Sequence, residues 1–87
     1  MEKFIVIVGR AWCNSDGTGI DYNSDLIMHD TRGIAAYEGL SSVESDDFNI
    51  GVVRDGKLVS LDWMDEVVES DPAVLSQIAE QICLEQP

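Results

Sequence analysis

Two runs of strand-forming residues separated by an Asp-Gly pair constrain the fold of this chain more than any other feature. The runs cover residues 48–54 (FNIGVVR) and 57–61 (KLVSL), and Asp55 and Gly56 stand between them. Both central residues of a type I′ turn need a positive φ, which this pair adopts readily. The sequence therefore predicts a β-hairpin over residues 48–61.

Strands and a loop are expected before this hairpin. Residues 4–8 (FIVIV) are apolar at every position, as in a central strand or a strand covered on both faces. Residues 13–25 are dense in Gly, Asn, Asp and Ser, which predicts a long surface loop with a short extended stretch at residues 20–22. Residues 26–28 (LIM) form a candidate second strand.

Three short helices are also expected. Thr31 can cap the first helix, which ends near Leu40, and Asp62 can cap the second. Asp71 can cap the third, because Pro72 fits the first helical position. The apolar positions expected to pack are Ile34, Ala35, Tyr37 and Leu40 in the first helix, Met64, Val67 and Val68 in the second, and Val74, Leu75, Ile78 and Ile82 in the third.

These elements predict an α+β fold, with a small, mainly antiparallel sheet and about two to three helices packed on one face. The apolar content of 45% is enough for one core. We found no linker, repeat or low-complexity tract. The sequence therefore predicts a single compact acidic domain over residues 1–87.

The charge is strongly unbalanced, with 17 Asp and Glu against 5 Lys and Arg and a formal net charge of −12. From Asp62 onward there are seven acids and no base. Self-repulsion of this size costs stability, so the charge either has a use or serves solubility. It argues against direct binding to nucleic acid or to an anionic membrane, since both demand a basic surface.

The acidic segment after the hairpin carries the main functional hypothesis. In a helix, carboxylates at three- and four-residue steps lie roughly 5–6 Å apart, near the separation of successive phosphates, so such a row can occupy a basic groove. Two acids near the end of the last helix oppose its dipole without a compensating base. Trp63 is either core or an aromatic anchor. The predicted partner-binding residues are Asp62, Trp63, Asp65, Glu66, Glu69, Glu80 and Glu85; the alternative is a solvated acidic face.

Catalytic and metal-binding patterns are weak. The only histidine, His29, is expected to be structural, Cys13 lies in acidic surroundings that disfavour a thiolate, and Cys83 is expected in the core. The Asn14–Asp25 segment partly fits a Ca²⁺-binding EF-hand loop, but its final acidic ligand is too short. We therefore expect neither an enzyme nor a cofactor, and a Ca²⁺-responsive module is the weakest alternative.

The expected location is the cytoplasm. Met1-Glu2-Lys3 precedes an apolar run too short for a secretory signal, and no stretch approaches the roughly 18 apolar residues that span a membrane. Two cysteines without a paired motif favour free thiols.

In size, charge and composition the chain resembles, as a class, phage-encoded inhibitors such as anti-CRISPR proteins and nucleic-acid mimics, and it is similar to immunity proteins against nuclease toxins. The resemblance implies a non-enzymatic protein that inhibits a basic, nucleic-acid-handling partner, most simply a phage anti-defence protein. The alternatives are a toxin immunity protein and an accessory domain whose acidity serves solubility only. The oligomeric state is not predicted.

Overall fold

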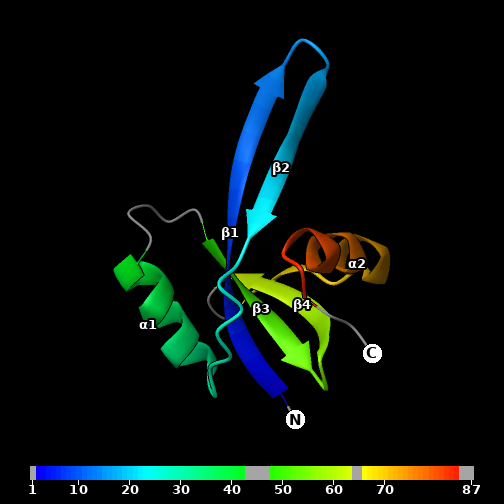
Figure 1. Ribbon diagram of the computed structural model, residues 1–87. Helices are drawn as coiled ribbons and strands as arrows, with labels where there is room; N and C mark the ends of the chain where they lie inside the picture. The colour runs from blue at the N-terminus through cyan, green and yellow to red at the C-terminus, as the bar shows by residue number, and fades with distance from the viewer. Residues whose placement is uncertain (1, 43–47, 64–65, 85–87) are drawn as a thin grey trace.

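The computed structural model describes residues 2–42, 48–63 and 66–84, which form a five-stranded antiparallel sheet and two helices (Figure 1). The sheet order is β2-β1-β3-β4-β5. Helix α1 (Arg32–Ser42) follows β2, and helix α2 (Pro72–Gln81) follows β5. The predicted α+β class is confirmed. The strands are β1 (Glu2–Asn14), β2 (Gly17–Asn23), β3 (Phe48–Arg54), β4 (Lys57–Trp63) and β5 (Glu66–Glu69).

The predicted hairpin is present as β3 and β4. Arg54 pairs with Lys57 at its end, and the two turn residues between them have φ values of 53° at Asp55 and 83° at Gly56. Positive φ at both positions is what a type I′ turn requires. The hairpin prediction is therefore confirmed.

Strand β1 divides the core into two parts. Ile5 and Ile7 belong to the cluster that includes α2, whereas Phe4 and Val6 belong to the cluster that includes α1. Successive side chains of a strand point to opposite faces of the sheet. The helices therefore cover opposite faces (Figure 1), and the prediction that they pack on one face is wrong.

Helix α1 begins as predicted but presents the opposite face to the core. The Thr31 hydroxyl accepts a hydrogen bond from the Ile34 N–H at 3.2 Å, as expected of a helix cap. Of the four predicted core positions only Ala35 is buried. Ile34, Tyr37 and Leu40 are exposed, so the predicted apolar stripe faces away from the sheet.

A close approach between α1 and β3 explains this orientation. A Cβ atom added to Gly39 would lie 2.4 Å from the Phe48 ring, far inside van der Waals contact. With Ala35 fully buried nearby in sequence, the sheet-facing side of α1 consists of small residues. Small side chains let the helix backbone come close to the sheet, and larger ones do not fit there.

Helix α2 follows its sequence signals closely. The Asp71 carboxylate accepts a hydrogen bond from the Ala73 N–H at 2.9 Å, and Pro72 occupies the first turn. The predicted apolar positions Leu75, Ile78 and Ile82 are buried against the sheet, whereas Val74 lies at the exposed margin.

The predicted loop over residues 13–25 is wrong, because most of this segment forms β2 and its turn. Strands β1 and β2 pair from Val8 with Asn23 to Asn14 with Gly17. The resulting hairpin arm, residues 9–23, projects beyond the rest of the sheet (Figure 1). Most of its side chains are exposed on both faces, so the sequence carries no hydrophobic alternation. The extended stretch expected at residues 20–22 lies within β2.

Two further predicted elements differ from the structure. Residues 26–28 are not a strand; the neighbouring pairing is a single bridge between Phe4 and His29. The helix expected after Asp62 is replaced by the end of β4 and by β5, with Asp62 opposite Val67. Two adjacent valines in β5 favour a strand because their branched side chains suit a pleated surface. Met64 and Asp65 lie outside the described residues.

Candidate partner-binding surface

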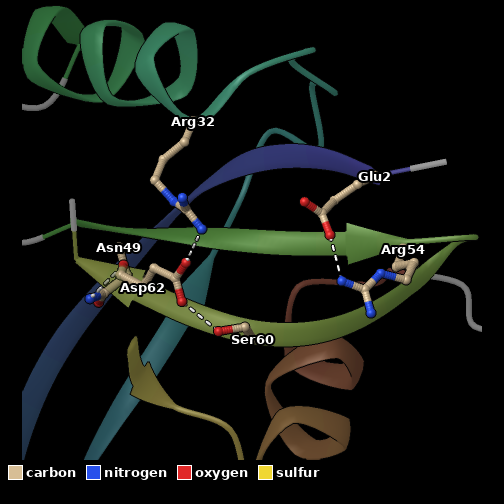
Figure 2. Close-up of polar contacts among 6 residues, drawn as sticks. All are labelled: Glu2, Arg32, Asn49, Arg54, Ser60 and Asp62. Carbon is tan, nitrogen blue, oxygen red and sulfur yellow. Dashed lines mark hydrogen bonds and ion pairs between the residues drawn. The ribbon is translucent and has the colours of Figure 1, made fainter. Parts of the chain in front are cut away.

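Asp62 is buried and serves the fold, which corrects its prediction as a partner-binding residue. Its carboxylate accepts hydrogen bonds from Arg32 Nη2 at 2.7 Å and from the Ser60 hydroxyl, and its backbone carbonyl accepts one from Asn49 Nδ2 at 3.5 Å (Figure 2). The residue is 1% exposed. A buried carboxylate needs such partners, and the bond from Arg32 links β4 to the first residue of α1.

The cation that holds Asp62 also contacts an aromatic ring. The Arg32 guanidinium carbon lies 5.4 Å from the centre of the Phe4 ring, a cation–π distance. No sequence signal links Arg32 to Asp62, because the two residues are thirty positions apart and strand β3 lies between their elements. The two residues meet only because the fold places the first turn of α1 over strand β4.

Trp63 is partly buried and serves the core at least in part. Its ring centre lies 5.1 Å from that of Phe48, with the planes at 70°, an edge-to-face contact. The remaining surface of Trp63 lies beside the exposed strand β5, since Trp63 pairs with Glu66 in the sheet. Trp63 can therefore contribute to an interface without leaving its place against Phe48.

The acids of β5 do not form the predicted helical row. Glu66 is exposed, whereas the Glu69 carboxylate is half-buried and accepts hydrogen bonds from the N–H groups of Ser70 (3.2 Å) and Asp71 (3.1 Å). Along a strand, residues three apart are separated by about 10 Å, twice the helical spacing. The expected mimicry of successive phosphates by one helix face is therefore wrong in its geometry.

Of the other predicted acids, one lies on a different element and two lie outside the described residues. Glu80 is exposed on α2. Asp65 and Glu85 lie outside the described residues. The structure thus brings Trp63, Glu66 and Glu69 together along β4 and β5 and places Glu80 on a separate element.

Exposed apolar residues accompany the acids of β5. Val67 and Val68 are 63% and 57% exposed on the strand at the edge of the sheet. The sequence predicts both valines in the core of a helix, so it does not predict their exposure. We call the residues Trp63, Glu66, Val67, Val68 and Glu69 the β5 surface. It combines negative charge with apolar contact area, and an interface of this kind has an apolar core with polar groups at its rim.

The positive charges of the chain are largely used within it. Lys3 pairs with Asp30, Arg54 pairs with Glu2 at 2.6 Å, and Arg32 pairs with Asp62. The hydrogen bond from the Lys3 ammonium, together with its charge, holds the pKa of the Asp30 carboxyl below its ordinary value. These pairs leave few cations to balance the remaining acids.

Most acids are exposed. Ten of the twelve Asp and Glu side chains that the structure describes face solvent, and only Asp62 is buried. The surface is therefore negative over several elements, not on one helix. The exposed acids are Glu2, Asp16, Asp21, Asp25, Asp30, Glu38, Asp55, Glu66, Asp71 and Glu80.

The remaining candidate residues are the histidine and the two cysteines. The backbone of His29 exchanges two hydrogen bonds with Phe4, at 2.9 and 2.8 Å. Cys13 and Cys83 are exposed free thiols, so the expectation that Cys83 is core is wrong. Cys83 follows the end of α2 with a φ of 63°, a conformation common just beyond a helix.

The segment considered for Ca²⁺ does not form a loop. Strand β2 separates Asn14 from Asp25, so the two ends cannot converge on one ion. Among residues 2–42, 48–63 and 66–84, no group of three or more His, Cys, Asp or Glu side chains is placed to hold a metal ion.

Comparisons with known proteins found no matching family model, no matching curated protein and no matching solved structure. In the described part of the chain, neither helix is long and apolar enough to cross a membrane.

Proposed function

We propose that this chain is a non-enzymatic binding protein whose acidic surface engages and inhibits a basic, nucleic-acid-handling protein. The observation that carries the proposal is the exposure of ten of twelve described acids, while three of the five cations are paired within the chain. A protein that binds nucleic acid through Lys and Arg presents the complementary charge. Long-range attraction between the two surfaces speeds their encounter.

The β5 surface is our candidate for the contact itself. Charge alone gives steering more than affinity, and affinity comes from buried aromatic and apolar anchors. Trp63 pairs with Glu66, and Val67 and Val68, which point to opposite faces of the edge strand, add exposed apolar area along it. The arrangement fits a basic partner surface that also contains an apolar patch.

Within this class of inhibitors we favour a phage-encoded anti-defence protein. An immunity protein against a nuclease toxin would use the same charge complementarity, so the identity of the partner separates the two. An accessory domain that is acidic only for solubility would have no specific basic partner.

Capture from host lysate in low salt tests the proposal. The immobilised protein should retain a nucleic-acid-binding protein. Added duplex DNA or RNA should release that partner, and the nucleic acid that the partner binds more tightly should release more of it. The purified partner should lose activity when the chain is added. Retention that nucleic acid does not affect, or a partner without a nucleic-acid-binding surface, would contradict the proposal.

Two charge reversals of equal size locate the contact. Glu66→Lys changes the β5 surface, and Asp21→Lys changes the hairpin arm; both residues are exposed. If the β5 surface is the contact, Glu66→Lys should weaken capture more than Asp21→Lys. Equal losses would indicate attraction spread over the whole surface and would remove β5 from the proposal.

A further inference from the structure

Strand β5 leaves one edge of the sheet open in the described part of the chain. It is the last strand in the order β2-β1-β3-β4-β5, so it pairs there with β4 alone. An edge strand presents unpaired backbone N–H and C=O groups, which can pair with a strand of another chain. Val67 and Val68 are exposed on β5, and branched side chains of this kind favour strand pairing. The edge therefore offers backbone hydrogen bonds and apolar contact together.

The charge around β5 indicates which kind of chain can pair with this edge. Residues 63–71 hold four acids and no Lys or Arg. Glu66 and Asp71 are exposed, and the cation that reaches β4 from α1, Arg32, is already paired with Asp62. A basic extended segment is therefore attracted to this edge. A Lys or Arg placed opposite Glu66 would also form a favourable cross-strand pair.

The same charges disfavour a second copy of this chain on β5. The strand reads Glu-Val-Val-Glu, so a symmetric antiparallel pair of two such strands places Glu66 of each copy opposite Glu69 of the other. Like charges directly opposite each other destabilise a strand pair, and charged residues on an edge strand protect against such pairing. The acids of β5 therefore exclude self-pairing and admit a basic segment.

The strand at the other edge of the sheet, β2, lacks this combination. Its acid Asp21 lies opposite Arg10 of β1 in the sheet register, so a cation accompanies it. Strand β2 also contains Gly17 and Gly19, and glycine weakens a strand. Of the two edges, β5 is the one that fits a basic strand.

We propose that a segment of the basic partner adds to the sheet as a further strand beside β5, with apolar residues at its centre and Lys or Arg at its ends. The inference rests on the proposed function and specifies how the partner binds. The apolar residues contact Val67 and Val68, and the cations lie near Glu66 and Glu69. Strand addition takes its affinity from main-chain hydrogen bonds and its specificity from the side chains.

Isothermal titration with two synthetic peptides tests the inference without the partner. The first is acetyl-Lys-Lys-Val-Val-Lys-Lys-amide with L residues throughout. The second has the same sequence with D residues at alternate positions, so its charge and composition are unchanged but it cannot form a regular strand. The all-L peptide should bind about tenfold more tightly or better, because only it can make several backbone hydrogen bonds. It should also slow hydrogen exchange at the amides of β5. Equal affinity of the two peptides, or no binding of either, would overturn the inference.

Val68→Lys and Ile20→Lys are a matched pair of variants. Val68 on β5 is 57% exposed and Ile20 on β2 is 48% exposed, and both substitutions add one positive charge to an edge strand. Val68→Lys should weaken binding of the all-L peptide by about tenfold, because it places a cation where a basic strand must pair. Ile20→Lys should weaken binding much less, and both variants should keep the wild-type melting temperature. Equal losses would overturn the inference.

The proposed function can fail independently of this inference. A lysate that yields no basic partner contradicts the proposed function, even when the two peptides differ as expected. A captured partner together with peptides of equal affinity contradicts the strand addition alone.

Discussion

Arg32 and Asp62 join the first turn of α1 to strand β4 through an ion pair of 2.7 Å. The two partners differ in environment, because the Asp62 side chain is 2% exposed and the Arg32 side chain 39%. If Arg32 is removed, the remaining carboxylate is buried, whereas if Asp62 is removed, the remaining guanidinium is partly exposed to water. This asymmetry gives the first prediction.

Arg32→Met should destabilise the domain more than Asp62→Asn. The first change leaves a buried carboxylate without its cation, at a cost of about 3 kcal/mol, whereas the second leaves a cation that water can reach, at about 1–2 kcal/mol. Urea unfolding of both variants measures the difference. The double variant should cost less than the sum of the two, because the residues are coupled. Equal and additive losses would show that the pair is not a stabilising unit.

Gly39→Ala and Gly33→Ala should change stability in opposite directions although both lie in α1. A Cβ on Gly39 meets the Phe48 ring at 2.4 Å, so overpacking should cost about 1–3 kcal/mol. A Cβ on Gly33 meets nothing within 4 Å, so better helix propensity should stabilise by up to about 1 kcal/mol. Thermal unfolding compares the two. A stabilising Gly39→Ala would contradict the close approach of α1 to β3.

Gly56→Ala should destabilise the β3–β4 hairpin by about 1 kcal/mol or more, because alanine avoids positive φ. The φ of 83° at this residue is the reason for the expected loss. Thermal and urea unfolding provide the measurement. Unchanged stability would remove the type I′ turn from the account of the fold.

The pair between Lys3 and Asp30 should make part of the stability depend on pH. Because the pKa of Asp30 is lowered in the folded state, its contribution is present above the ordinary carboxyl value of about 3.9 and is lost as the pH falls through the lowered value. Asp30→Asn should therefore lower the melting temperature at pH 7 and have little effect near pH 2. Asp21→Asn, which removes the same charge from the hairpin arm, corrects for the change in net charge. If Asp30→Asn lowers the melting temperature as much near pH 2 as at pH 7, this assignment is contradicted.

Local signals were sufficient where backbone chemistry fixes the conformation. The Asp55-Gly56 turn, the Thr31 cap and the Asp71-Pro72 start of α2 all act within a few residues, and the structure has each of them. They depend on side-chain to backbone bonds or on allowed φ values, which the sequence states directly.

Features that depend on long-range pairing could not be predicted in the same way. The hairpin arm is exposed on both faces, so its strands lack hydrophobic alternation. The two valines of β5 fit a helix as well as a strand over only four residues, so the pattern does not identify the strand. The buried face of α1 was wrongly predicted for a different reason, which concerns the apolar stripe Ile34, Tyr37 and Leu40. Its large residues suggested the buried face, whereas the Phe48 ring requires small ones there.

Most residues of the candidate site could be predicted from the sequence, but their arrangement in space could not. Glu66, Glu69 and Trp63 do lie together, yet on strands, and Asp62 between them belongs to the core. Whether a carboxylate on a strand faces solvent or an arginine from another element is decided by the register of that strand. The partner for Asp62 comes from α1, thirty residues away.

The dependence of partner affinity on salt tests the central claim most directly. For the captured partner, we predict a dissociation constant that rises steeply between about 50 and 200 mM salt, because the screening length falls toward 8 Å over this range. Glu66→Lys should reduce both the affinity and its dependence on salt more than Asp21→Lys does. An affinity that does not change with salt would contradict the claim, and the acidity of the chain would then be a matter of solubility.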